Sequence, residues 1–564
     1  MKKAILILVA IAVAVAILCL ILLPKAGVND GAELVPASTV AYVTLPDLKR
    51  TADRWPHTAL AQILAEPQVS EFLAKPSSRV LSSEGGVEAA QILLNLKPGR
   101  FFFAVTDVRT GESEGIDAIL GFRYFGGRKD LDSAMARFHA ELQKRFPDGK
   151  LTTSQYEGET ITAFELDKFT VFTGAHAPWG FVTTSDATLK EAMDRAAGRN
   201  KEAALAGVES FSKVSSHLPS EPDFFWFVQP QPIFELMVAI GKEANEALNE
   251  DQAEEIRKIQ AVGGSLKLDG ALQRETTFAL VSNPPDTGSL DHSMIKLTSP
   301  ETTVFYNGVI DWKKLTSEDN LSSIPDEAKA RLSELGVDLA ALSEVFGNEL
   351  GFYLNWRPDA MVPGVMVALP VKDRAKAENT LNSLSQTFGL QTSESDVNGA
   401  RVIEFPGARL QLVDPCVAIS DSLFLGSLTS GDIEQALNRK PDAPTLESSE
   451  SFAEAKPMWN ETQQAFGYVD AKGLFERVYN QLRPIIIFSS AMMPGVSDFI
   501  DISKLPETEA ISSHLQPIVS IQRRLDDGYL IESSGPITMT QAFALVGAGA
   551  AAVISSQKAG QQGP

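Results

Sequence analysis

The chain has 564 residues, of which 44% are hydrophobic, and its 72 acidic residues outweigh 50 basic ones to give a formal net charge of −22. Such a surface repels phosphate backbones and anionic lipid headgroups, which argues against nucleic-acid binding and against broad docking on charged membranes. The two cysteines, Cys19 and Cys416, do not form a disulfide framework because Cys19 falls inside a long apolar run, so the folded part must be stabilised by its core.

Residues 1–25 predict a membrane anchor. Lys2-Lys3 precedes an uncharged apolar run from Ala4 to Leu23, and Pro24-Lys25 closes it. A helix of this length spans the hydrocarbon core of a bilayer. The leading lysines favour the cytoplasmic side, which predicts a protein of the cytoplasmic (inner) membrane with its bulk extracytoplasmic, in the periplasm. A cleaved signal peptide is the alternative, although its apolar region is usually shorter and it ends at small residues, where this chain has Pro24.

Residues 34–290 predict one α+β unit. Its ordered landmarks are a first strand at 40–43 followed by Asp47, aromatic residues at 101–103, a strand at 118–122, an amphipathic helix carrying Leu131, Met135, Phe138, Leu142 and Phe146, a hairpin turn at Glu157-Gly158, a strand at 179–182, a helix with Leu189 and Met193, the triplet Glu209-Ser210-Phe211, and an Asp269-Gly270 turn. The spacing of three and four residues places His139 on the solvated side of the first helix.

Residues 300–537 repeat these landmarks in the same order after a polar, proline-rich linker at 282–288. The second set comprises a strand at 304–307 followed by Asp311, apolar residues at 350–353, a strand at 365–369, a helix with Ala377, Leu381, Leu384 and Phe388, a turn at Asn398-Gly399, a strand at 423–426, a helix with Ile433 and Leu437, the triplet Glu450-Ser451-Phe452, and an Asp527-Gly528 turn. So many matches in one order predict an internal duplication. The predicted fold class is therefore α+β, with two homologous tandem units of antiparallel sheet, each with helices packed on one face, after an N-terminal transmembrane helix.

An apolar segment in the second unit is a candidate contact surface. It runs from Pro484 through Ile485, Ile486, Ile487 and Phe488 to Met492 and Met493, without clear periodicity and framed by proline. One interpretation is a buried helix start, which the first unit repeats at 232–238. The other is an apolar lip that contacts lipid, lipoprotein or another protein.

The C-terminal segment 538–564 contains a second apolar stretch, Ala542–Ile554. It is short for a membrane span but reaches the required length if residues from Pro536 onward are included. Its small residues favour close packing against another helix in lipid. The sequence leaves open a two-pass protein and a peripheral helix.

Two stretches resemble a known family. Leu34–Val43 is similar to its opening motif, and Ser420–Ser427 with the helix that follows is similar to its recurrent strand–helix element. The family is the bacterial domain of unknown function 3352, found in membrane-anchored envelope proteins. The resemblance covers most of the chain after the anchor and implies export. The family carries no established activity, cofactor or catalytic residue, so the resemblance assigns none.

No motif for chemistry stands out in the sequence. The six histidines show no metal-binding spacing, and HExxH, CxxC and GxSxG are missing. Ser210-Phe211-Ser212-Lys213 fits SxxK, but the S-D-N and K-T-G elements that accompany it in serine acyl-enzymes do not occur. Cys416 is predicted to be a buried strand residue rather than a reactive thiol.

The predicted function is therefore a membrane-anchored extracytoplasmic binding or structural protein, not an enzyme, without cofactor or metal. Its expected partners are the membrane, through the N-terminal helix, and an envelope protein, polymer or lipid. Two alternatives stay open at this point. One is a lipid-handling envelope protein with an apolar groove, and the other is an envelope hydrolase whose site is assembled by tertiary contacts.

Overall fold

The structure is a computed structural model, and it describes residues 29–81, 96–109, 115–167, 169–243, 257–316, 342–356, 360, 363–387, 391–405, 414–459, 462–492 and 501–544. The predicted anchor Ala4–Leu23 and most of the apolar stretch Ala542–Ile554 lie outside these residues. Among the helices that are described, none combines the length and the apolar character needed to cross a membrane.

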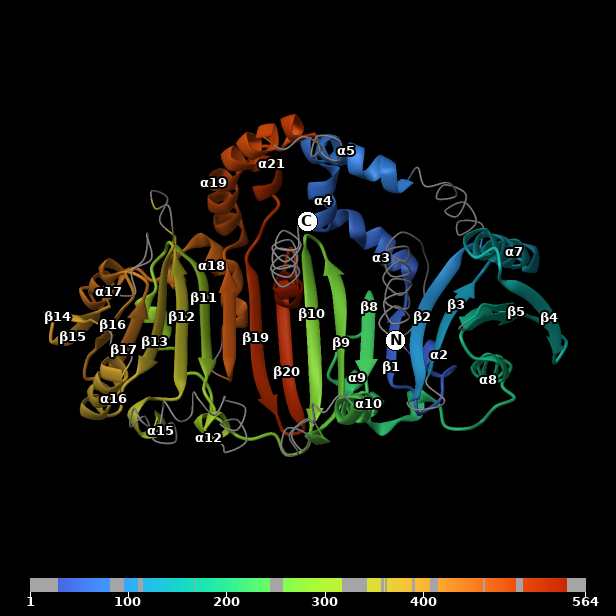
Figure 1. Cartoon of the computed structure of the whole chain (residues 1–564), viewed down its shortest axis with the longest axis horizontal. Coiled ribbons are helices and arrows are strands. Elements are labelled where there is room, and N and C mark those ends of the chain that lie inside the picture. The colour runs from blue at the N-terminus through green and yellow to red at the C-terminus, as the bar shows by residue number, and fades with distance from the viewer. Residues whose placement is uncertain are drawn as a thin grey trace. The chain divides into compact units, whose positions relative to one another are not determined.

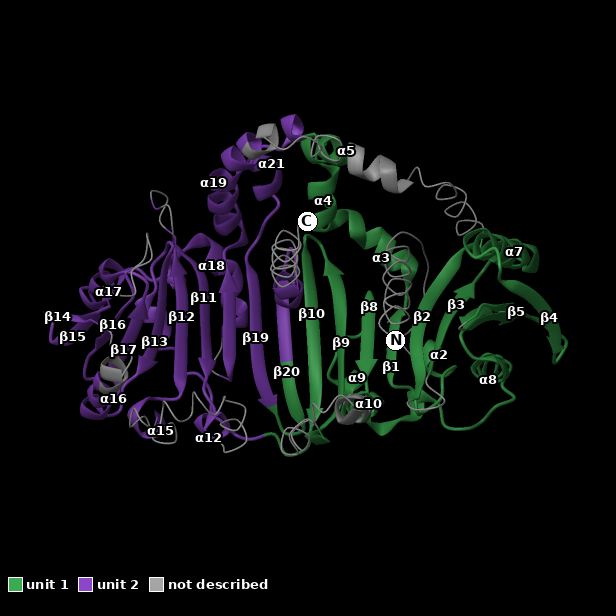
Figure 2. Ribbon diagram, in the orientation of Figure 1, with its two compact units in different colours: residues 1–284, 498–501, 525–530 green, residues 285–497, 502–524, 531–564 purple. Residues whose placement is uncertain are grey.

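The chain divides into two compact units (Figure 2). Unit 1 comprises residues 1–284, 498–501 and 525–530, and unit 2 comprises residues 285–497, 502–524 and 531–564. Each unit is built on an antiparallel sheet with helices, which confirms the α+β class (Figure 1).

The strands of unit 1 pair in the order β4-β5-β6-β7-β3-β2-β1-β8-β9-β10, and every neighbouring pair is antiparallel. Their bounds are β1 (Ala41–Leu45), β2 (Pro98–Arg109), β3 (Gly115–Tyr124), β4 (Lys150–Tyr156), β5 (Glu159–Glu165), β6 (Thr170–His176), β7 (Trp179–Thr183), β8 (Phe224–Val228), β9 (Ile259–Asp269) and β10 (Leu272–Val281). The helices are α2 (Asn29–Ala32), α3 (Leu48–Arg54), η1 (Trp55–His57), α4 (Ala59–Ala65), α5 (Pro67–Leu81), α7 (Arg128–Arg145), α8 (Asp186–Ala196), η3 (Leu205–Gly207), α9 (Glu209–Ser216) and α10 (Pro230–Glu243).

The strands of unit 2 pair in the order β14-β15-β16-β17-β13-β12-β11-β18-β19, again antiparallel throughout, with β20 beside β19. Their bounds are β11 (Thr302–Val309), β12 (Glu349–Asn355), β13 (Gly364–Pro370), β14 (Ser393–Val397), β15 (Ala400–Glu404), β16 (Cys416–Ile419), β17 (Leu423–Ser427), β18 (Ala465–Val469), β19 (Ile518–Leu525) and β20 (Gly528–Gly535). The helices are η4 (Met294–Leu297), α12 (Trp312–Leu315), α15 (Leu342–Val345), α16 (Arg374–Thr387), α17 (Ser430–Leu437), η7 (Leu446–Ser448), α18 (Glu450–Ala455), η8 (Lys456–Met458), α19 (Ala471–Met492), η9 (Ile502–Lys504) and α21 (Glu509–Ser512).

Turn chemistry predicted from the sequence fixes one hairpin in each unit. Glu157 and Gly158, between β4 and β5, have φ angles of 50° and 81°, and Asn398 and Gly399, between β14 and β15, have 53° and 79°. Two successive residues with positive φ define the turn whose twist matches that of paired strands. Both predicted turns are therefore confirmed.

The tip of the C-terminal hairpin, residues 525–530, belongs to unit 1. The amide of Val281 donates to the carbonyl of Asp527 at 3.0 Å, and His217 Nε2 lies 3.1 Å from Asp527 Oδ2. The sequence predicts that Gly528 is part of the turn. In the structure it is instead the first residue of β20. A Cβ on Gly528 would lie 2.0 Å from the carbonyl oxygen of Ala279, so this close backbone approach requires glycine.

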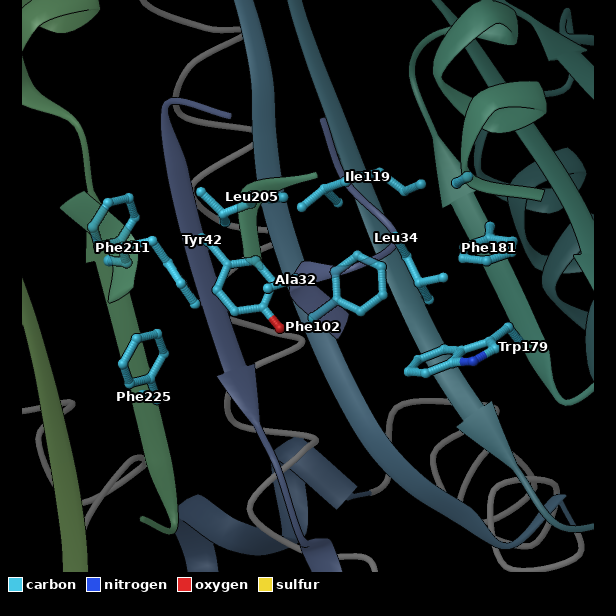
Figure 3. Close-up of a cluster of buried hydrophobic side chains, with 14 of the residues drawn as sticks. Ala32, Leu34, Tyr42, Phe102, Ile119, Trp179, Phe181, Leu205, Phe211 and Phe225 are labelled. Carbon is cyan, nitrogen blue, oxygen red and sulfur yellow. The ribbon is translucent and has the colours of Figure 1, made fainter. Parts of the chain in front are cut away.

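Each sheet has a core on both of its faces. In unit 1, Phe102 belongs to a cluster with Tyr42 and with helix residues such as Phe211 (Figure 3). Its neighbour Phe101 contacts a separate cluster that contains Leu131 of α7. In unit 2 the neighbours Ala418 and Ile419 also belong to different clusters. The cluster that contains Ile419 includes Ala377 of α16. Alternate strand residues point to opposite faces of a sheet. The prediction of helices on one face only is therefore wrong, because α7 and α16 cover the other face.

The inner stripe of α7 also differs from the prediction. Leu131 is buried, but Phe138 is 37% exposed, so it is not the core residue that its spacing predicted. His139 faces inward instead, with Nε2 2.8 Å from Thr173 Oγ1, and burial lowers its pKa. Leu131, Met135, His139 and Leu142 form the continuous stripe at intervals of three and four, and a histidine within it carries no hydrophobic signal.

Candidate functional site

Helix α19 is fixed to unit 2 near its middle. Tyr479 Oη donates to the carbonyl of Pro506 at 2.6 Å, and Arg483 Nη2 donates to Glu507 Oε1 at 2.7 Å. Between them, Asn480 Oδ1 accepts from Thr508 Oγ1 at 2.5 Å. The segment 506–508 therefore holds the helix as far as Arg483, just before Pro484.

Beyond Pro484 the helix exposes its apolar side chains. Ile485, Ile486, Ile487 and Phe488 are 58%, 36%, 46% and 70% exposed, and Leu482 one turn earlier is 46% exposed. Successive helical residues are rotated by about 100°, so these four consecutive residues point to all sides of the helix. We call Ile485–Phe488 the apolar lip. Met492 ends α19, but its side chain and all of Met493 lie outside the described residues.

The corresponding segment of unit 1 is different. Residues 232–238 lie in α10, where Phe234 is only 3% exposed and Ile233 is 36% exposed. The guanidinium of Arg257 lies 5.7 Å from the ring centre of Phe234 and covers it further. Residues 232–238 thus include a core position, whereas the lip extends into solvent, so the interpretation as a buried helix start fits α10 and not α19.

A buried carboxyl group in unit 2 was not predicted. Glu349 opens β12, is 6% exposed, and accepts a hydrogen bond from the amide of Asp291 at 3.2 Å through Oε2. Burial, followed by the hydrogen bond to the Asp291 carboxyl, raises the pKa of Glu349 to about 7, while the same hydrogen bond lowers the pKa of Asp291. Asn307 of β11 also contacts Glu349, is fully buried, and donates from Nδ2 to the carbonyl of Leu350 at 3.2 Å. Only a lone glutamate beside an apolar run marks this site in the sequence, and such a residue is usually exposed.

Three other candidate residues, His292, His217 and Lys213, make structural contacts. The ring of His292 lies 4.0 Å from that of Trp459, and His217 stacks at 3.9 Å on Phe278. Nowhere in the described ranges do three or more histidine, cysteine, aspartate or glutamate side chains converge to hold a metal ion. Lys213 of the SxxK match pairs with Glu209 at 2.8 Å instead of contacting Ser210.

Cys416 lies in β16 as predicted. It is 1% exposed, and burial raises the pKa of its thiol to about 12. A thiol in this state is neither ionised nor accessible at neutral pH, so it is a core residue.

Comparison with known proteins gives a family. No curated protein matches the chain significantly. Among solved structures, crystal form I of TP0453 aligns with a TM-score of 0.25 and 12% identity, and crystal form III with 0.26 and 13%; each alignment covers 45% of this chain and 80% of the other. These TM-scores do not define a shared fold. The pattern of the family described as "Protein of unknown function (DUF3352)" matches residues 129–501, and it is to this family that the chain belongs.

Proposed function

We propose that this protein is an extracytoplasmic binding or structural protein, held at the cytoplasmic membrane by Ala4–Leu23, that engages an apolar partner through its lip and carries out no catalysis. The observation that carries the proposal is the exposure of Ile485–Phe488 around the whole circumference of α19. An isolated exposed apolar side chain is common, but a cluster of four in succession is not, and such clusters mark contact sites.

The anchor is supported by the sequence. Lys2-Lys3 followed by the apolar run to Leu23 is the pattern of a helix that stays in the membrane with its start in the cytoplasm. Both units follow this run in the chain. On this proposal they lie on the extracytoplasmic side, and the protein reaches its partner there.

We further propose that the two units arose by internal duplication. Their strand orders match from β1 through β10 and from β11 through β20. Equivalent side chains also make equivalent bonds. Thr44 Oγ1 donates to the carbonyl of Phe101 at 2.8 Å, and Asn307 Nδ2 donates to that of Leu350 at 3.2 Å. Asp47 and Asp311 both cap the helix that follows the first strand. Two tethered copies favour two-point engagement, because the second contact gains effective concentration.

A non-catalytic role is supported by the state of the reactive groups. Glu349 is only 6% exposed and is engaged by the backbone amide of Asp291, the Asp291 carboxyl and Asn307, so its carboxyl is not presented to a substrate in solvent. The Ser210 hydroxyl lacks the lysine that would activate it, because Lys213 pairs with Glu209.

Charging the lip tests the proposal. Because Ile486 and Phe488 are exposed, replacing both by Asp is expected to leave the thermal midpoint within about 2 °C of wild type while abolishing co-purification of the partner after crosslinking in cells. Phe125→Asp is the matched control, since Phe125 is 51% exposed in unit 1 and should retain the partner when charged. A double variant that stays folded and keeps every crosslinked partner would refute the proposed contact.

A further inference from the structure

The lip has a shape that one partner surface does not cover well. A helix lying in a protein groove buries one stripe, and its opposite side stays in water. Here Leu482, Ile485, Ile486, Ile487 and Phe488 are all exposed and stand at different angles around the helix. A helix that is apolar all round belongs in a core or in lipid.

The length and charge of this segment fit one leaflet of a bilayer. From Pro484 to the end of α19 at Met492, the helix rises about 12 Å, close to half of a hydrocarbon core of about 30 Å. The sequence carries no charge from Pro484 through Ser497. Arg483 immediately precedes this stretch, and its guanidinium pairs with Glu507. The hydroxyl of Tyr479 donates to the carbonyl of the adjacent Pro506. Arginine and tyrosine side chains are typical of the interface between a membrane and water.

We propose that the apolar lip of α19, Ile485–Phe488, inserts as a tip into one leaflet of a lipid bilayer. This inference rests on the proposed function, because it names lipid as the partner that the lip engages. The net charge of −22 argues that attraction to anionic headgroups does not drive the contact. Burial of apolar side chains drives it, so binding does not require anionic lipid and persists at high salt.

The test places an environment-sensitive fluorophore at the tip of the full-length chain in vesicles of phosphatidylcholine. The probe is attached to Phe488→Cys in a Cys19→Ser background; Cys416 is 1% exposed and its thiol pKa is raised to about 12, so it does not compete for the label. Asp421→Cys is the control, because the Asp421 side chain is 90% exposed in the same unit. Nitroxide-labelled lipid should quench the tip probe about 3-fold or more over the control, and about 1 M NaCl should leave that ratio unchanged.

The outcomes distinguish insertion of the tip from attachment of the chain to the membrane. Vesicles that float with the protein while both probes are quenched equally would overturn tip insertion and leave the anchored location in place. A tip probe that is shielded from water but not quenched by lipid would also overturn tip insertion, because the lip would then be covered by protein and not by lipid. Failure of the chain to float with the vesicles would contradict the anchor itself. Adding Ile486→Asp and Ile487→Asp should return quenching at position 488 to the control level.

Discussion

Phe452→Ala is expected to cost unit 2 about 3–5 kcal/mol, as truncation of a fully buried aromatic residue generally does. Phe452 is 0% exposed, and its ring centre lies 5.4 Å from that of Tyr468, 6.0 Å from that of Phe466 and 6.3 Å from that of Trp459. Removing the ring leaves a cavity between α18 and the sheet that these neighbours cannot fill without leaving their rotamers. Urea unfolding followed by circular dichroism measures the loss.

The proposed duplication predicts the same loss in unit 1. Phe211 of α9 is 1% exposed and lies 5.0 Å from Phe227 and 5.7 Å from Phe225, so Phe211→Ala should cost a comparable amount. Phe138→Ala is the control, since its side chain is 37% exposed and its loss should stay below about 1 kcal/mol. A large effect of Phe138→Ala, together with a small effect of Phe452→Ala, would contradict the core described for each unit.

Glu349→Gln is expected to change how stability depends on pH. The folded state raises the pKa of Glu349 from its ordinary value of 4.5 to about 7, so the folded protein holds this proton more tightly than the unfolded chain. The resulting stabilisation is fully present below pH 4.5 and is lost as the pH rises through 7. The glutamine amide keeps the acceptor for the amide of Asp291 and cannot ionise, so the variant should be more stable than wild type at about pH 8 by roughly 1–3 kcal/mol.

The comparison should be made at two pH values. At about pH 4.5 the wild type and Glu349→Gln should have similar free energies of unfolding, because the carboxyl is protonated in the folded protein and half protonated in the unfolded chain. Asp291→Asn is the matched variant. It removes the neighbouring carboxyl that raises the Glu349 pKa, so it should move the wild-type pH dependence to lower pH. If the free energy of unfolding depends on pH identically in wild type and Glu349→Gln, the Glu349 carboxyl does not titrate between about pH 4.5 and pH 8.

Local patterns predicted most of the fold. Gly158 and Gly399 mark hairpins because glycine adopts a positive φ freely, and the strands predicted at 118–122 and 423–426 are found in β3 and β17. Periodicity did not settle which face a helix covers. In α7 the inner position is taken by His139, whose burial depends on Thr173, thirty-four residues away. A pattern of hydrophobic residues cannot register such a polar tertiary contact.

The candidate sites were less accessible to sequence reasoning. Residues 485–488 are equally compatible with a core and with a surface, because hydrophobicity does not say whether another element covers them. The exposure of Phe488 follows from where α19 leaves its contacts at Arg483. Glu349 was missed because its pKa is raised by burial and then by the hydrogen bond to Asp291, and because the two side chains that it contacts, Asp291 and Asn307, precede it by 58 and 42 positions in the sequence. Acidic side chains are rarely buried, so a sequence offers no reason to single one out.

On the proposed function, both units lie outside the cytoplasm and are held by the N-terminal helix. The direct measurement is labelling of Asp421→Cys, in the full-length chain with Cys19→Ser, by a membrane-impermeant maleimide on spheroplasts. Asp421 is 90% exposed, and the buried Cys416 does not compete. Equal labelling is expected before and after the membrane is permeabilised. Labelling that occurs only after permeabilisation would place unit 2 in the cytoplasm and refute the proposed location.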